Sequence, residues 1–320
     1  SLALLCFLGA GHTHEAGEFR PQVKAGLEYL IRNMEVSEFG GDLRGGFTSQ
    51  GMYVQGLAAI VLCEALAMTN EAPPQVSAGR ASDPPPAASE ERRRDTLPLR
   101  EAAQQAVGFI AWAQHSEGGW RYAPKQRGDT SVVGWQVMAL ESARSARIRI
   151  APGTLARVSQ FLNRVQIERG ARYGYDSPRR EGSATSAVGL LCRMYLGWRR
   201  DHPALARGIQ HLSRRGPDRN DMYHNYYATQ VLHHWGGDEW QAWNAVMRDG
   251  LVHAQDTEGH AKGSWPPTGS LGAIHGGRLY QTTLSIMTLE VYYRHLPLYR
   301  ARNLDAETPQ LSPESQSPAN

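Results

Sequence analysis

The stretch QHSEGGWRYAPKQRGDTSVVGWQVMAL, residues 114–140, indicates how this chain folds. It begins with a glutamine, reaches Gly-Gly-Trp four residues later, and continues through a polar loop into a long apolar segment. The same order returns at Gln166 with Tyr173, and at Gln255 with Trp265. A pattern that recurs at this spacing is typical of a protein built from structural repeats.

The repeats predict pairs of helices. The glutamine position, which Arg214 occupies in one unit, recurs about every 40 to 50 residues, enough for a helix, a loop and a second helix. The helix before each anchor is less apolar than the one that follows the loop, so we expect outer and inner helices. The predicted inner helices lie in residues 1–8, 47–68, 128–143, 182–198, 222–235 and 280–296.

Six helical hairpins predict an all-α fold, an (α/α)6 toroid in which the first hairpin is truncated. We expect residues 1–302 to form this single domain. Residues 71–97 are rich in Pro, Ala and Ser and cannot bury enough apolar surface to offset their ordering entropy. We expect them to be a disordered inserted loop, and 303–320 a disordered tail.

Composition excludes some functions. The net charge of +3, with 41% hydrophobic and 20% charged residues, is typical of a globular protein and too small to indicate a nucleic-acid surface. The three cysteines lie in apolar runs without CxxC spacing, which predicts buried free thiols. We find no apolar run approaching the roughly 20 residues of a membrane span. Ser1 lies inside an apolar stretch, so we expect residues before it, and no cellular location is predicted.

The repeats, with GGWRYAP at 118–124, DMYHNYYATQ at 221–230 and GGRLYQTTLSIMTLEVYYRHLPLY at 276–299, resemble the prenyltransferase and squalene-oxidase repeat superfamily. Within it they resemble planctomycete-type repeat proteins. The resemblance covers roughly 1–70 and 98–300. It implies a toroid like those of terpene cyclases and protein prenyltransferase β subunits. It also implies that the repeat Gln and Trp residues are structural, the amide bonding backbone groups at helix ends while the ring packs on it.

Parallel inner helices would gather their N-termini at one end of a central cavity, where free N–H groups favour an anion such as a diphosphate, or an electron-rich group. Asp129 lies there, because QRGDT at 126–130 aligns with the acidic DxDDT motif with which squalene-hopene-type cyclases protonate an alkene. Here Gln126 and Gly128 replace two of the acids. Asp129 is therefore either a catalytic acid or an ordinary N-cap of the helix that follows.

His224 is the second candidate catalytic residue, because DMYHNYY resembles the prenyltransferase β segment whose histidine binds zinc. The resemblance implies an Asp and a Cys on the preceding inner helix as the other ligands. That helix has no carboxylate at its start, and Cys192 lies roughly two turns too deep. We therefore interpret His224 as lining the cavity or hydrogen bonded, and we expect neither a metal nor a cofactor.

Other residues at the starts of the inner helices predict the lining of a ligand cavity. Aromatic rings there could steady a carbocation, although core packing explains most of them equally well. The candidates are Tyr53, Thr130, Trp135, Tyr223, Tyr226, Tyr227 and Tyr280. The sequence predicts a terpene-cyclase-like isomerase or prenyltransferase-like protein that binds an isoprenoid or similar apolar molecule. The alternative is a noncatalytic binding or scaffold toroid.

Overall fold

The computed structural model describes residues 1–46, 49–70, 87–182, 184–292 and 304. Helices make up 63% of it and strands 5%, which confirms the all-α prediction. The helices that we call inner are α1 (Leu2–Gly9), α3 (Gly51–Asn70), α5 (Thr130–Ser145), α7 (Thr185–Tyr195), α9 (Met222–Trp235) and α11 (Leu271–Glu290). The outer helices are α2 (Arg20–Arg32), α4 (Ala87–Ala113), α6 (Thr154–Val165), α8 (Pro203–Arg215) and α10 (Gly237–Ala254).

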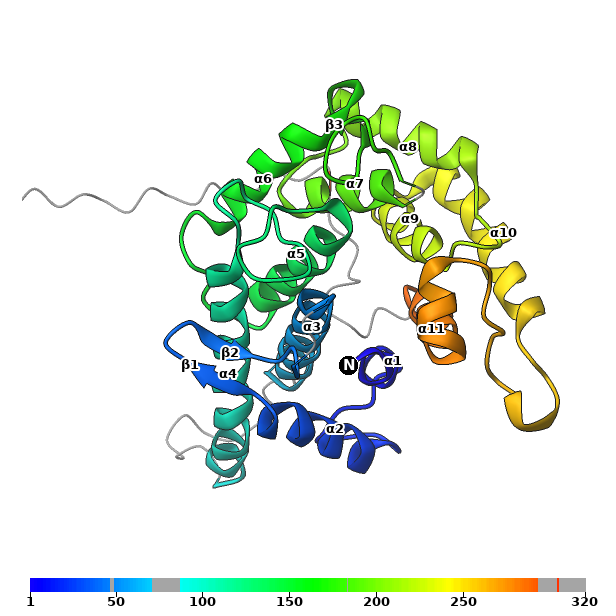
Figure 1. Ribbon diagram of the computed structural model, residues 1–320. Coiled ribbons are helices and arrows are strands. Elements are labelled where there is room, and N and C mark those ends of the chain that lie inside the picture. The colour runs from blue at the N-terminus through cyan, green and yellow to red at the C-terminus, as the bar shows by residue number, and fades with distance from the viewer. Residues whose placement is uncertain (47–48, 71–86, 183, 293–303, 305–320) are drawn as a thin grey trace, which may run out of the picture.

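Each inner helix packs on the next one along the chain: α3 on α5, α5 on α7, α7 on α9 and α9 on α11. The first inner helix, α1, contacts both α11 and α3. The outer helices lie around this set in Figure 1, and each contacts the inner helix before it. The inner helices α5, α7 and α9 are buried on most sides, whereas the first half of α11 is largely exposed and α2 buries only Val23 and Leu27. The predicted division into better-buried and outer helices is therefore observed.

Small elements complete the connections. Strands β1 (Glu35–Ser37) and β2 (Gly40–Asp42) form an antiparallel hairpin, and β3 (Gln166–Ile167) pairs with β4 (Arg172–Tyr173). The short 3-10 helices are η1 (Glu168–Gly170) and η2 (Gly259–Ala261).

The predicted inserted loop, residues 71–97, extends too far at its C-terminal end. Residues 71–86 lie outside the described residues, but α4 begins at Ala87, so 87–97 are helical instead of belonging to the loop. Seven of the nine residues of AASEERRRD at 87–95 are Ala, Glu or Arg, which are strong helix formers, and the proline-rich part of the segment ends before them. Of the predicted tail, Leu304 is described. It is 4% exposed, and its carbonyl accepts a hydrogen bond from the Arg200 N–H.

The first repeat shows why its glutamine and tryptophan occur together. The Gln114 amide donates to the Gly118 and Thr154 carbonyls at 3.0 and 3.1 Å. The Trp120 indole, fully buried, donates to the Ile110 carbonyl at 2.7 Å, four residues before the glutamine. A carbonyl in the last turn of a helix has no partner within the helix, so Trp120 satisfies a backbone group at the end of α4, while Gln114 holds the following loop to the first residue of α6. Their predicted structural role is confirmed.

The Gln255 repeat uses the same device. Its amide donates to the Gly263 carbonyl at 3.0 Å, and the Trp265 indole donates to the Leu251 carbonyl at 2.8 Å. In the Gln166 repeat a tyrosine replaces the tryptophan. Tyr173 is fully buried, and its hydroxyl instead accepts a hydrogen bond from Arg193 Nε at 3.1 Å.

Cys6, Cys63 and Cys192 are buried free thiols, as predicted. The expectation that no segment has the composition of a membrane span was wrong for α3. Residues Gly51–Thr69 have a mean hydropathy of 1.6 and suffice to cross a membrane by length and composition. In the fold, 78% of that window is buried, as in the core helix of a soluble protein, so its composition is weak evidence for a span.

Candidate functional site

Asp129 begins α5 and is completely buried. Its Oδ1 accepts a hydrogen bond from the Val132 N–H at 2.9 Å, which is the geometry of an N-cap. Its own N–H donates to the Trp120 carbonyl at 2.9 Å, so the aromatic residue of the repeat fixes the position of the acid. The N-cap interpretation is therefore confirmed. A capping carboxylate still has a second oxygen, and the surroundings of Oδ2 decide whether Asp129 has a chemical role.

Thr130 joins the start of α5 to the loop before α7. Its hydroxyl donates to the Gly174 carbonyl at 2.6 Å, and its N–H donates to the Tyr175 carbonyl at 2.7 Å. Thr130 is fully buried, so its predicted place in a cavity lining is wrong, since the side chain is used to hold this loop. The consequence is that Tyr175 is fixed next to the acid.

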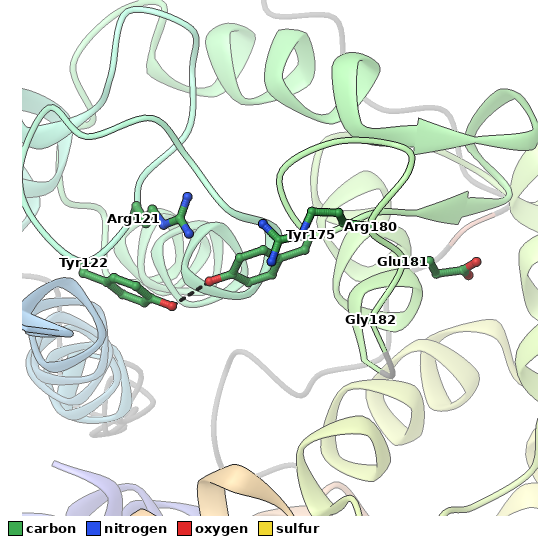
Figure 2. A pocket seen from close by; sticks show the side chains of 6 residues that line it. All are labelled: Arg121, Tyr122, Tyr175, Arg180, Glu181 and Gly182. Carbon is green, nitrogen blue, oxygen red and sulfur yellow. Dashed lines mark hydrogen bonds between the residues drawn. The ribbon is translucent and has the colours of Figure 1, made fainter.

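An open cleft of about 490 Å³ lies beside this junction. Figure 2 shows the side chains that line it, with the hydroxyls of Tyr122 and Tyr175 pointing at each other at an O–O distance of 2.6 Å. Sequence reasoning did not select this set: Arg121, Tyr122, Tyr175, Arg180, Glu181 and Gly182. The available signal was position, because Arg121 and Tyr122 directly follow the repeat tryptophan and precede a helix start.

Two guanidinium groups lie near the ring of Tyr175. The carbon centres of Arg121 and Arg180 are each 5.4 Å from its centroid, within the range of cation–π contacts. Asp176 forms ion pairs with both, at 3.5 Å to Arg121 and 2.8 Å to Arg180. Arg121 Nε also lies 3.8 Å from Asp129 Oδ2. The arginines at the cleft are thus already compensated by carboxylates.

The pKa of Asp129 is raised to about 6, because burial disfavours the ionised form. The Val132 N–H, the Tyr175 hydroxyl and the Arg121 charge act in the opposite direction and limit the rise. Oδ2 makes no hydrogen bond of normal geometry within the described part of the chain, although Tyr175 and Arg121 are its neighbours. Asp129 therefore changes its protonation state near pH 6, and its buried Oδ2 keeps unused hydrogen-bonding capacity beside Arg121 and Tyr175.

Four of the predicted aromatic residues gather at this end of the inner helices. The rings of Tyr53 and Tyr122 are 6.2 Å apart, and those of Tyr223 and Tyr227 are 5.0 Å apart. The Tyr223 hydroxyl donates to the carbonyl of Ser131, two residues after Asp129, at 3.1 Å. The pKa of Tyr223 is raised, mainly by burial and then by its tyrosine neighbours. We call the following residues the tyrosine cluster: Tyr53, Tyr122, Tyr175, Tyr223, Tyr227 and Tyr280.

Trp135 and Tyr226 lie in a denser layer next to the cluster. Their rings stack at 5.6 Å, and Tyr227 meets Trp135 edge-on at 5.7 Å. The exposed fractions of Trp135 and Tyr226 are 3% and 1%. A carbon added to Gly134 would come within 2.5 Å of Val188. These rings pack on one another, so for Trp135 and Tyr226 the structure agrees with core packing, the alternative to lining a cavity.

His224 is fully buried and faces the outer helix α10, where its ring meets Trp243 edge-on at 6.0 Å. Its pKa is lowered, first by burial and then by Arg215. Neither ring nitrogen makes a hydrogen bond of normal geometry to a described residue, although the Gly216 backbone is a neighbour that acts to raise the pKa, so the hydrogen-bonded role stays a prediction. Within the described ranges, no three His, Cys, Asp or Glu side chains are grouped to hold a metal ion. The structure thus brings the tyrosines to Asp129 and turns His224 toward the outer layer.

No protein-family model matches the chain, and no curated protein matches it.

Proposed function

We propose that this chain is a terpene-cyclase or prenyltransferase-like repeat protein whose inner helices enclose a site for an isoprenoid or another elongated apolar ligand. The successive contacts among the inner helices, with α1 touching both α3 and α11, support an (α/α)6 toroid. Ligand sites commonly lie between helices that face one another in such an arrangement. Because a fold does not determine a function, the proposal depends on the chemistry at Asp129.

One observation carries the proposal: a fully buried carboxyl group with an unbonded oxygen lies beside the tyrosine cluster. Tyr53, Tyr223 and Tyr280 are partly exposed, unlike the rings packed behind them. Aromatic faces bind apolar chains and attract positive charge, while the carboxyl group orients or protonates one end of the ligand. This combination suits a molecule that is apolar along its length and reacts, or is recognised, at one point.

If the protein is a cyclase, Asp129 is its acid. The O–H bond at Oδ2 breaks, the proton forms a C–H bond with the π electrons of a terminal alkene, and a carboxylate and a carbocation result. The cyclised cation loses a proton to water, which regenerates an alkene, and a proton from solvent restores the Asp129 carboxyl group. A carboxyl group with a pKa of about 6 is a weak acid for this step. The structure therefore supports ligand binding more strongly than alkene protonation.

The test separates binding from turnover. Squalene or a polyprenol is added to the purified protein, a shift in unfolding temperature reports binding, and mass spectrometry searches for an isomer of the substrate. Asp129→Asn preserves an N-cap acceptor but removes the proton donor, so a cyclase loses turnover and keeps binding. Asp238→Asn is the control, because Asp238 is an exposed carboxylate in the first turn of the outer helix α10. Undiminished turnover in Asp129→Asn would exclude Asp129 from the mechanism.

A noncatalytic scaffold is the second candidate, and the dense layer of Trp135, Tyr226 and Tyr227 favours it. If such packing continues through the middle of the protein, no space is left for a long ligand. In that case none of the isoprenoids shifts the unfolding temperature. Absence of any shift for both squalene and a polyprenol would therefore select the scaffold.

A further inference from the structure

Three of the inner helices hold a side-chain acceptor at their N-terminal ends, whereas α1 and α7 have no side-chain cap. Asp129 caps α5 at 2.9 Å, Asp221 caps α9 at 3.0 Å, and the Ser270 hydroxyl caps α11 at 3.3 Å. Free N–H groups at a helix start favour an anion, but a carboxylate that caps them satisfies a donor and adds a negative charge. The sequence-based expectation of a diphosphate at this end assumed that those groups are free, and for α5 and α9 they are capped by carboxylates.

The charges around the cleft also disfavour an anionic ligand. Arg121 and Arg180 face it, and the carboxylates near them are Asp129, Asp176 and Glu181. Apart from Glu181, whose partner is Arg172, two cations face two anions when Asp129 is ionised, so this group of side chains carries no net positive charge. Arg121 and Arg180 both pair with Asp176, and Glu181 is itself paired with Arg172 at 2.9 Å, outside this group. A diphosphate would have to compete with existing carboxylates for each guanidinium group, in a partly buried site where like charges repel strongly.

The remaining polar groups are uncharged hydroxyls. Burial raises the pKa of Tyr53, Tyr223 and Tyr280, so these phenols keep their protons at physiological pH. The pKa of Tyr280 is raised further by Asp221, which adds a negative charge beside this part of the cluster. Neutral phenols and aromatic faces match an alkene or an alcohol, because neither brings a charge to be desolvated.

We infer that the ligand of this site is an uncharged isoprenoid, a polyene or a polyprenol, and that the site discriminates against prenyl diphosphates. The inference rests on the proposed function and narrows it to one class of ligand. Its physical basis is the set of carboxylates at the helix starts, which occupy the donors and oppose a polyanionic head group.

The experiment compares geranylgeraniol with geranylgeranyl diphosphate, which share a chain and differ only in the head group. Both are titrated against the full chain, and quenching of tryptophan fluorescence reports the dissociation constants. We expect the alcohol to bind at least about tenfold more tightly, which corresponds to about 1.4 kcal/mol. Asp129→Asn combined with Asp221→Asn keeps two cap acceptors and removes two charges. In this double variant the difference between the dissociation constants of the alcohol and the diphosphate should become smaller. Asp238→Asn, an exposed carboxylate in the first turn of α10, leaves the preference unchanged.

Three results overturn the inference. A diphosphate that binds as tightly as the alcohol or more tightly contradicts it and leaves the proposed isoprenoid site intact. A preference that does not narrow in the double variant shows that these carboxylates are not its cause. Binding of neither molecule contradicts the proposed function and removes the inference with it.

Discussion

Asp129 and Glu290 are buried carboxyl groups at opposite ends of the inner helices, and their surroundings differ. Asp129 starts α5, accepts the Val132 N–H and has Arg121 at 3.8 Å. Glu290 ends α11, is 5% exposed, and its Oε2 has no hydrogen-bond partner in the described part of the chain. A carbon added to Gly9 at the end of α1 would lie 2.1 Å from that oxygen, so the two helices meet tightly there.

The pKa values follow from this difference. Burial raises the pKa of Asp129 to about 6 and that of Glu290 to about 8. Hydrogen bonds and a cation offset part of the rise for Asp129, whereas burial alone acts on Glu290. At pH 7 most Asp129 is ionised and most Glu290 is protonated. Burial thus keeps Glu290 uncharged, whereas the hydrogen bonds and Arg121 preserve a charge on Asp129 in spite of its burial.

The largest expected effect comes from Glu290→Gln, measured as unfolding free energy between pH 4 and pH 9. Above about pH 4.5 the unfolded chain has lost the proton that folded Glu290 keeps. Stability is therefore lost as the pH rises from about 4.5 to about 8, by up to about 5 kcal/mol. The glutamine has no such proton, so the variant lacks this loss and becomes more stable relative to the natural chain at pH 9 than at pH 5.

Glu28→Gln is the control for that experiment, because Glu28 is exposed on the outer helix α2. It should keep the pH dependence of the natural chain. An identical slope in Glu290→Gln and the natural chain would show that Glu290 is solvated or paired, and the contrast between the two ends would disappear.

Asp129→Asn gives the next effect, in a lower pH window. The raised pKa again means that the folded state holds a proton which the unfolded chain releases. Stability is lost as the pH rises from about 3.8 to about 6, by up to about 3 kcal/mol, and the asparagine variant lacks this loss. Unfolding free energies at pH 4 and pH 7 measure it.

Asp129→Ala separates the cap from the charge. It leaves the Val132 N–H without its acceptor and should cost about 1 kcal/mol more than asparagine at either pH. Equal stability of the alanine and asparagine variants would contradict the capping role. A pH dependence that persists in the asparagine variant would assign the titration to another group.

The sequence predicted the helical architecture well because each repeat carries its own local signal. Gln114 donates to the Gly118 carbonyl four residues later, Trp120 donates to the Ile110 carbonyl ten residues earlier, and Asp129 caps the helix that follows it. Glu290 was not selected, because its environment depends on α1, which is distant in the chain. Tyr175 was missed for the same reason, since the Thr130 hydrogen bonds bring its loop to α5.

His224 shows the opposite error. Its motif placed it at the correct helix start, but the side chain points toward Trp243 on the outer helix. Two adjacent residues of a helix point about 100° apart, so Tyr223 joins the cluster while His224 leaves it. A motif fixes the position of a residue along a helix more reliably than the direction of its side chain when the partner helices are unknown.

The smallest effect concerns the hydrogen bond that connects the Asp129 end to the cleft. Tyr122→Phe and Tyr175→Phe each remove one hydroxyl of the pair joined at 2.6 Å, and each should destabilise the fold by about 1 kcal/mol. The double variant should be less destabilised than the sum, because the second removal breaks no further bond between them. Urea unfolding of the natural chain, the two single variants and the double variant measures this coupling, with Tyr29→Phe, a 63% exposed tyrosine, as control.

The pKa of Asp129, followed by carboxyl carbon NMR, should also rise in Tyr175→Phe, because the Tyr175 hydroxyl favours the ionised form. Additive losses together with an unchanged Asp129 pKa would show that the pair is a surface contact without influence on the acid.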